Sequence, residues 1–118
     1  GLPAQRQVVD AFFAAARGGR LADLVAVLHD DVVFRGDDGH GLRTVLGADA
    51  VGRQARSYAG DERQVHAAVV DGAAGAVVVM GGLPVSVMAF TVVAGRIATI
   101  DALTDPARIS LDLTWLLG

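Results

Sequence analysis

Residues 64–103 read QVHAAVVDGAAGAVVVMGGLPVSVMAFTVVAGRIATIDAL, and this stretch decides the fold class. It contains four runs rich in β-branched residues, which are 65–70, 76–80, 85–93 and 96–103. The runs are separated by Asp71-Gly72, Gly81-Gly82 and Ala94-Gly95. Such pairs favour two-residue hairpin turns, because glycine adopts a positive φ without steric cost. The stretch therefore predicts an antiparallel meander of four strands.

The sequence before the meander has a helical pattern. Apolar residues recur at helical spacing over residues 4–17, and Pro3 suits a first helical turn, where its missing N–H is not needed. Gly18-Gly19 ends this helix, and the same spacing predicts further helices over residues 20–28 and 47–58. The N-terminal half is thus predicted to be mainly helical.

A short hairpin interrupts the helices. Residues 32–35 and 42–46 read as strands around the loop 36–41, and the polar residues 29–31 separate the first strand from the second helix. Helices first and a meander last is an α+β order. We expect residues 1–118 to form a single domain whose curved antiparallel sheet wraps around the N-terminal helices as a cone. The mouth of such a cone suits a small-molecule pocket.

Composition excludes several classes of function. A net charge of -3 provides no basic field for a phosphate backbone, so we expect no direct nucleic-acid contact. The absence of Cys excludes disulfides and thiol chemistry and fits a cytoplasmic protein. No apolar run approaches the roughly 20 residues that a membrane helix needs. The chain begins Gly1-Leu2-Pro3, without an initiator Met, and we expect it to be the C-terminal part of a longer chain.

The loop Asp37-Asp38-Gly39-His40 combines two carboxylates with an imidazole. This set could perform general acid–base chemistry or bind a hard cation. The alternative is a solvated hairpin loop in which Asp and Gly serve turn geometry. The sequence leaves both interpretations open.

Asp101 is a second candidate for chemistry. Strict alternation along its strand places Ile97, Thr99 and Asp101 on one face. If that face points into the cone, burial would raise the pKa of the Asp101 carboxyl and make it a base. If the face points outward, the carboxylate is solvated.

The remaining polar residues point to simpler roles. Asp71 before Gly72 suits a turn, and Tyr58 at helical spacing suits a helix packed on the core. His29, His40 and His66 have no spacing typical of metal ligands, so we expect no metal site. Nucleophile elbows, phosphate-binding loops and dinucleotide fingerprints are absent from the sequence, and we expect no cofactor.

Along nearly its whole length, the sequence resembles the SnoaL-like branch of the nuclear transport factor 2-like superfamily. Within that branch it resembles in particular the C-terminal domain of some extracytoplasmic function (ECF) sigma factors. The first part of the resemblance lies in residues 8–12 of the first helix, in residues 21–33, in the loop 38–41 and in residues 47–51. Residues 70–75 (VDGAAG) and 104–109 (TDPARI) resemble two motifs of the sigma-factor domains. The resemblance implies a cone-shaped fold and a role in tuning sigma activity.

The resemblance leaves a regulatory and an enzymatic interpretation open. A non-catalytic regulatory domain would contact the sigma regions of the same parent chain and the RNA polymerase core, and its cone could hold a small apolar ligand. An apolar tail over residues 107–117 could dock on a partner. The residues assigned to the pocket or to these contacts are Phe12, Phe13, Asp38, Asp71, Gly72, Asp101, Asp105, Pro106 and Trp115.

The enzymatic alternative is a free-standing polyketide cyclase or ketosteroid isomerase type of protein. Asp101 or Asp38 would then be the base, and His40 or Tyr58 would donate to the enolate. A third interpretation is a homodimer that pairs through the outer face of the sheet. Its apolar surface would come from Val77, Val79, Val85, Val87 and Met88.

Overall fold

The computed structural model describes residues 1–105, 108 and 109. Helices come first in the chain and a strand-rich half comes last, which confirms the predicted α+β class. The elements are α1 (Leu2–Gly18), α2 (Leu21–Ala26), β1 (Leu28–Asp37), β2 (Leu42–Leu46), α3 (Ala48–Tyr58), β3 (Arg63–Val70), β4 (Ala73–Met80), β5 (Leu83–Val93) and β6 (Arg96–Leu103).

The strands form one six-stranded sheet in the order β2-β1-β6-β5-β4-β3. The predicted meander β3–β6 is present, and each of its turns has positive φ at both central residues. That geometry defines type I′ turns, whose twist matches the flanking strands. β1 and β6 pair in parallel, and this contact joins the N-terminal hairpin to the meander.

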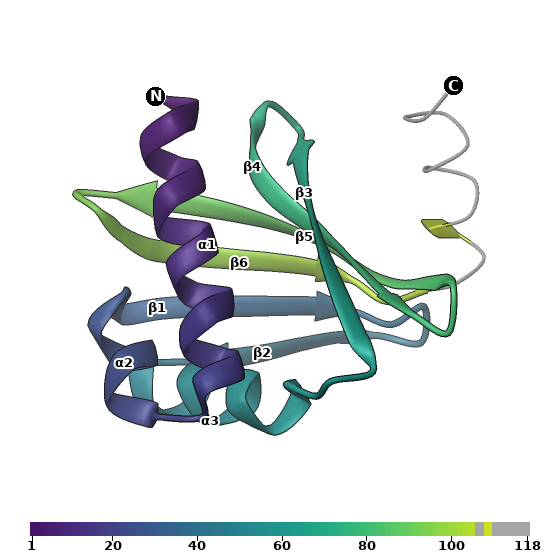
Figure 1. The fold of residues 1–118 in the computed structure, drawn as a ribbon, viewed down its shortest axis with the longest axis horizontal. Coiled ribbons are helices and arrows are strands. Elements are labelled where there is room, and N and C mark those ends of the chain that lie inside the picture. Colours follow the sequence, from purple (N-terminus) through teal and green to yellow (C-terminus); the bar gives the residue numbers. More distant parts are fainter. Residues whose placement is uncertain (106–107, 110–118) are drawn as a thin grey trace.

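The helices lie on one face of the curved sheet (Figure 1). α1 crosses the sheet, and α2 and α3 lie beside β1 and β2. The core between these layers includes Val9, Leu24, Leu28, Phe90 and Ile97, all at most 1% exposed. This arrangement is the predicted curved sheet around N-terminal helices. None of the helices in the described part of the chain is long and apolar enough to cross a membrane.

The boundary between α2 and β1 differs from the prediction. The helix ends at Ala26, and the strand already begins at Leu28, so the polar residues 29–31 are part of β1. The register with β6 shifts between Leu28 and Val33, and Asp30 and Asp31 are exposed there. A strand with a local irregularity therefore accommodates polar residues that the sequence pattern assigned to a break.

β6 also departs from strict alternation. Thr91 pairs with Thr99 while Val92 pairs with Ile97, so Ala98 is an additional residue in β6. Ile97 is consequently buried in the core together with Ile100, whereas Asp101 is exposed. The prediction that Ile97 and Asp101 share a face was wrong, because the extra residue reverses the alternation.

Candidate functional site

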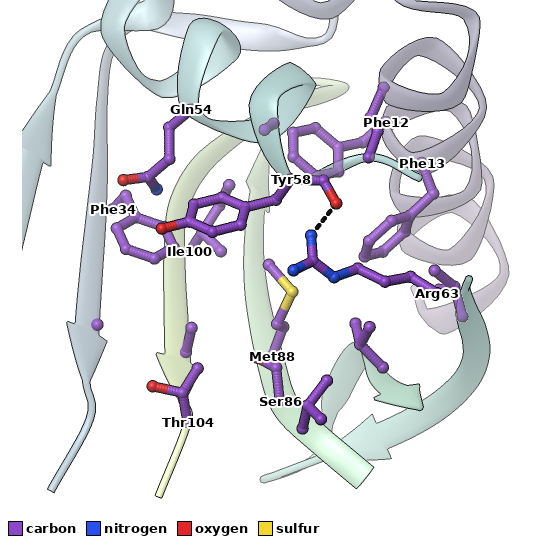
Figure 2. A pocket seen from close by; sticks show the side chains of 18 of the residues that line it. Phe12, Phe13, Phe34, Gln54, Tyr58, Arg63, Ser86, Met88, Ile100 and Thr104 are labelled. Atoms are coloured by element: carbon purple, nitrogen blue, oxygen red, sulfur yellow. Dashed lines mark hydrogen bonds between the residues drawn. The ribbon is translucent and has the colours of Figure 1, made fainter. Parts of the chain in front are cut away.

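A cavity of about 440 Å³ lies between α1, α3 and the concave face of the sheet. Figure 2 shows Phe12 and Phe13 entering it from α1, Tyr58 and Gln54 from α3, and Met88 and Ile100 from the sheet. We call this cavity the pocket. Its volume falls in the range that small-molecule sites usually occupy, about 300 to 1,000 Å³.

An aromatic cluster forms one wall of the pocket. The ring centroids of Phe12 and Phe13 lie 5.3 Å apart, and those of Phe13 and Phe90 lie 5.7 Å apart, both edge to face. Phe12 and Phe13 line the cavity, as the sequence interpretation proposed. They lie side by side because α1 presents two adjacent positions to a sheet that curves around it. The wall is apolar and provides no proton donor.

Tyr58 lies at the end of α3, and its side chain lines the pocket while 52% of the residue is exposed. The Arg63 guanidinium carbon lies 5.2 Å from the centre of the Tyr58 ring, and an Arg63 N–H donates to the Tyr58 carbonyl oxygen (Figure 2). A cation over an aromatic face is attracted by the ring quadrupole. The pair therefore fixes the chain between α3 and β3 at the edge of the pocket.

Gln54 brings a carboxamide into this apolar surrounding. It lies one turn before Tyr58 on α3, and its Oε1 atom is buried without a hydrogen-bond partner among the residues that the structure describes. A buried polar atom without a partner costs free energy, so its presence calls for an explanation such as a bound water, an ion or a functional role. Sequence reasoning missed Gln54, because a single glutamine on an amphipathic helix carries no pattern.

Asp38 lies at the mouth of the pocket, in the loop between β1 and β2. Its Oδ1 atom accepts hydrogen bonds from the backbone N–H groups of His40 at 2.8 Å and Gly41 at 3.1 Å. The bond from His40 is the main reason why the pKa of the Asp38 carboxyl is lowered. His40 is exposed and is not among the lining residues. This geometry is that of a solvated turn.

Asp101 lies on the other face of the sheet. Its carboxylate pairs with Arg35, with Nε and Oδ1 2.8 Å apart, and its side chain is 48% exposed. Ile100 and Ala102, its neighbours on β6, line the pocket. Of the two interpretations left open by the sequence, the structure has the outward one, in which the carboxylate is solvated.

Of the described residues in the two sigma-like motifs, Thr104 lines the pocket, whereas Asp71, Gly72 and Asp105 do not. Asp71 and Gly72 form the turn between β3 and β4, with φ of 51° and 78°. Asp105 follows β6 and packs so closely on Gly39 that a Cβ there would lie 2.9 Å from Asp105 Oδ2. Pro106 and Trp115 lie outside the described residues.

Asp37 anchors the chain after β6. Its backbone oxygen accepts from the Thr104 N–H at 2.8 Å, and its Oδ2 atom lies 3.0 Å from Arg108 Nη1. Ile109 is fully buried beyond this contact, and its N–H donates to the Asp105 oxygen. The acidic loop therefore has a structural task, which is to hold the segment that follows the sheet.

The pocket also contains three arginines that sequence reasoning missed. Arg17 comes from α1, Arg43 from β2 and Arg63 from β3. They lie far apart in the chain, so no spacing in the sequence could have grouped them. Within residues 1–105, 108 and 109, no group of three metal-ligating side chains gathers at one point.

No protein-family model and no curated protein sequence matches the chain. Solved structures do match it. The Mycobacterium tuberculosis ECF sigma factor SigJ is similar with a TM-score of 0.67 and 27% identity, over 92% of this chain and 44% of that chain. The chain thus spans less than half the length of SigJ.

Two further solved structures are similar at lower identity. A nuclear transport factor 2-like protein from Cytophaga hutchinsonii matches with a TM-score of 0.64 and 16% identity, over 90% of this chain and 94% of that chain. An LEH-like epoxide hydrolase from M. tuberculosis matches with a TM-score of 0.58 and 21% identity, over 99% and 98% of the two chains. The chain therefore has the SnoaL-like, nuclear transport factor 2-like fold and is similar to an ECF sigma factor.

Proposed function

We propose that the chain is a non-catalytic regulatory domain of an ECF-type sigma factor, acting in the cytoplasm on transcription initiation. The observation that carries the proposal is the similarity to SigJ, which extends over 92% of this chain but only 44% of that one. In this proposal the domain contacts the sigma regions of its own parent chain and the RNA polymerase core. A small molecule in the pocket would modulate those contacts.

The chemistry of the pocket supports a binding role over a catalytic one. Proton abstraction next to a carbonyl needs a carboxylate within hydrogen-bond reach of the substrate. Asp101 lies on the outer face, and among the described residues Asp38 is the one carboxylate that lines the cavity. A base also works best with a pKa near the working pH, whereas the backbone N–H of His40 lowers the pKa of Asp38. The similarity to an epoxide hydrolase at 21% identity extends to the fold alone.

The first test measures the size of the native gene product and identifies the proteins that co-purify with it. An antibody raised against residues 1–118 would be used on a lysate of the source cells, with antibody blocked by the purified chain as the control. The proposal expects a band well above 12.1 kDa that co-purifies with RNA polymerase. A band at the mass of this chain alone would overturn the proposal and would make the enzymatic alternative the next hypothesis.

The second test measures transcription by that longer product. Initiation from its own promoter would be compared between the intact protein and a version that lacks residues 1–118. A regulatory domain changes the rate of initiation while the remaining sigma regions still bind the polymerase. Equal rates for the two proteins, with and without a cell extract of small molecules, would contradict the regulatory role.

A further inference from the structure

Four arginines of the chain form ion pairs with aspartates among the described residues, and none of these four lines the pocket. Arg6, Arg20, Arg35 and Arg108 each lie within 4.0 Å of an aspartate oxygen. Across the described residues, no such ion pair involves Arg17, Arg43 or Arg63. Arg63 is held against Tyr58, and none of the carboxylates in the described part of the chain forms an ion pair with it.

The charge around the pocket is opposite in sign to the charge of the whole chain. The chain has a net charge of -3, yet its pocket is lined by three arginines and one aspartate. Asp38 directs Oδ1 to the N–H groups of its own loop, so that oxygen is already occupied. Charges of one sign at a cleft with low-dielectric walls concentrate the field there and attract ions of the opposite sign.

The inner surface of the same pocket is apolar. Figure 2 shows the Phe12, Phe13, Phe34, Met88 and Ile100 side chains around the cavity, with the Arg63 guanidinium reaching in among them. A ligand that filled this space would bury a hydrocarbon body against the walls, and each methylene removed from water strengthens binding. An anionic group on that body would lie within reach of a guanidinium, which suits carboxylate and phosphate geometry.

We propose that the pocket binds an amphipathic anion, a molecule with an apolar body and a single carboxylate or phosphate head that pairs with Arg63 and its neighbours. The inference rests on the proposed function in taking the pocket as the ligand site of the regulatory domain. The Oε1 atom of Gln54, which has no hydrogen-bond partner among the described residues, would accept a hydrogen bond from a donor along the ligand body.

The test is an NMR titration of residues 1–118 with three probes that share one alkyl chain: decanoate, 1-decanol and decyltrimethylammonium. Dissociation constants come from the shifts of backbone amides around the pocket, and the arginine Nε–H signals report the head group directly. A charge-assisted hydrogen bond predicts that decanoate binds about tenfold more tightly than 1-decanol, and that added salt removes this preference. The cationic probe is expected to bind least.

Substitutions of single arginines show which side chain pairs with the anionic head group of the probe. Arg63→Gln is expected to weaken decanoate binding about tenfold and to leave 1-decanol binding unchanged, because only the charge-assisted bond is lost. Arg53→Gln is the matched control, since Arg53 is an exposed arginine of α3 outside the pocket lining. If Arg63→Gln lowers the melting temperature, Arg17→Gln provides the same comparison without disturbing the contact to Tyr58.

The outcomes separate this inference from the proposed function. Three results would each overturn the proposal that the ligand is an anion. They are equal affinity for decanoate and 1-decanol, equal effects of Arg63→Gln and Arg53→Gln, and no binding of any probe. None of these results bears on co-purification with RNA polymerase. Conversely, selective decanoate binding by a chain whose native product is not associated with the polymerase would overturn the sigma-factor role alone.

Discussion

Single glycines set how closely the strands of the meander approach one another. A Cβ on Gly75 would overlap the Met88 carbonyl oxygen on β5 and lie 2.7 Å from Val70 Cγ2. A backbone oxygen within a ladder cannot move aside as the end of a flexible side chain can. A Cβ on Gly18, at the end of α1, would have no heavy atom within 4 Å, and the φ of Gly18 is not positive.

We therefore expect Gly75→Ala to lower the free energy of unfolding by about 2 to 3 kcal/mol through overpacking. Gly18→Ala, the control, should raise it by about 0.5 to 1 kcal/mol, because alanine loses less backbone freedom in a helix. Urea denaturation measures both changes. A Gly75→Ala protein as stable as the unmodified chain would mean that β4 and β5 are farther apart than described.

Asp38, at the mouth of the pocket, makes a pH-dependent contribution to the stability of the folded chain. Its pKa is lowered, chiefly by the His40 N–H, so the folded chain binds a proton there less readily than the unfolded chain. The resulting stabilisation is fully present above the unfolded pKa of about 3.9 and is lost as the pH falls through the lowered folded value. We expect the Asp38 carboxyl carbon to titrate below about 3.9 in an NMR pH series. A midpoint above that value would contradict the hydrogen bonds of this loop.

At the scale of elements, the sequence predicted the turns between strands but not the irregular pairing of the strands. The pairs Asp71-Gly72, Gly81-Gly82 and Ala94-Gly95 form the predicted turns, because positive φ at two successive residues is a local requirement. The additional residue in β6 is different, since it depends on how β5 pairs with it. No local signal marks Ala98 as that residue.

The same limit applies to β5 and to the proposed dimer surface. Val78 pairs with Ser86 while Val79 pairs with Pro84, so Val85 is an additional residue in β5. Val85 and Met88 both line the pocket. Two of the five residues proposed for the outer face therefore line the pocket, and the homodimer stays a prediction.

The shifted register of β6 has a measurable consequence at Ile97. Alternation places Ile97 on the face of the exposed Asp101, whereas the structure buries it completely. Ile97→Ala should cost about 3 kcal/mol of unfolding free energy, as expected for a large side chain removed from a core. Leu83→Ala, at a residue that is 69% exposed, should change stability by less than about 0.5 kcal/mol. Equal effects of the two substitutions would show that β6 alternates regularly after all.

At the scale of the whole molecule, Arg6 fastens α1 across the open end of the sheet. Its guanidinium donates to the carbonyl oxygens of Gly75 at 2.9 Å and Ala68 at 2.6 Å, on β4 and β3. These bonds join residues more than 60 positions apart in the chain. They hold the helix that provides Phe12 and Phe13 against the strands that provide the opposite wall.

Arg6→Ala is expected to cost about 2 kcal/mol, because two backbone carbonyls lose a charged donor in a half-buried position. The control is Arg20→Ala, which removes an arginine whose side chain is 83% exposed and whose partner is Asp23. Surface pairs of that kind contribute less than about 1 kcal/mol. Thermal unfolding of the two variants side by side makes the comparison, and similar melting temperatures would contradict the fastening role.

The overall cone was predictable, whereas the polar character of the pocket was not. Helices followed by a meander specify a curved sheet around helices, and adjacent aromatic residues on the first helix point into it. The head-group residues Arg17, Arg43 and Arg63 are brought together only by the tertiary fold, from α1, β2 and β3. Gln54 becomes notable only once the tertiary fold shows that none of the residues described around Oε1 forms a hydrogen bond with it.

The parallel contact between β1 and β6 has a consequence for biosynthesis. Among the described strands β1 is synthesised first, yet its central neighbour in the sheet, β6, is synthesised after the other five. Until residues 96–103 have emerged, a nascent chain carries an unpaired edge on β1 and lacks Ile97 and Ile100 of the core. Such edges template aggregation. A chain whose translation stalls before β6 should therefore be a substrate for chaperones, and its release should depend on synthesis of that strand.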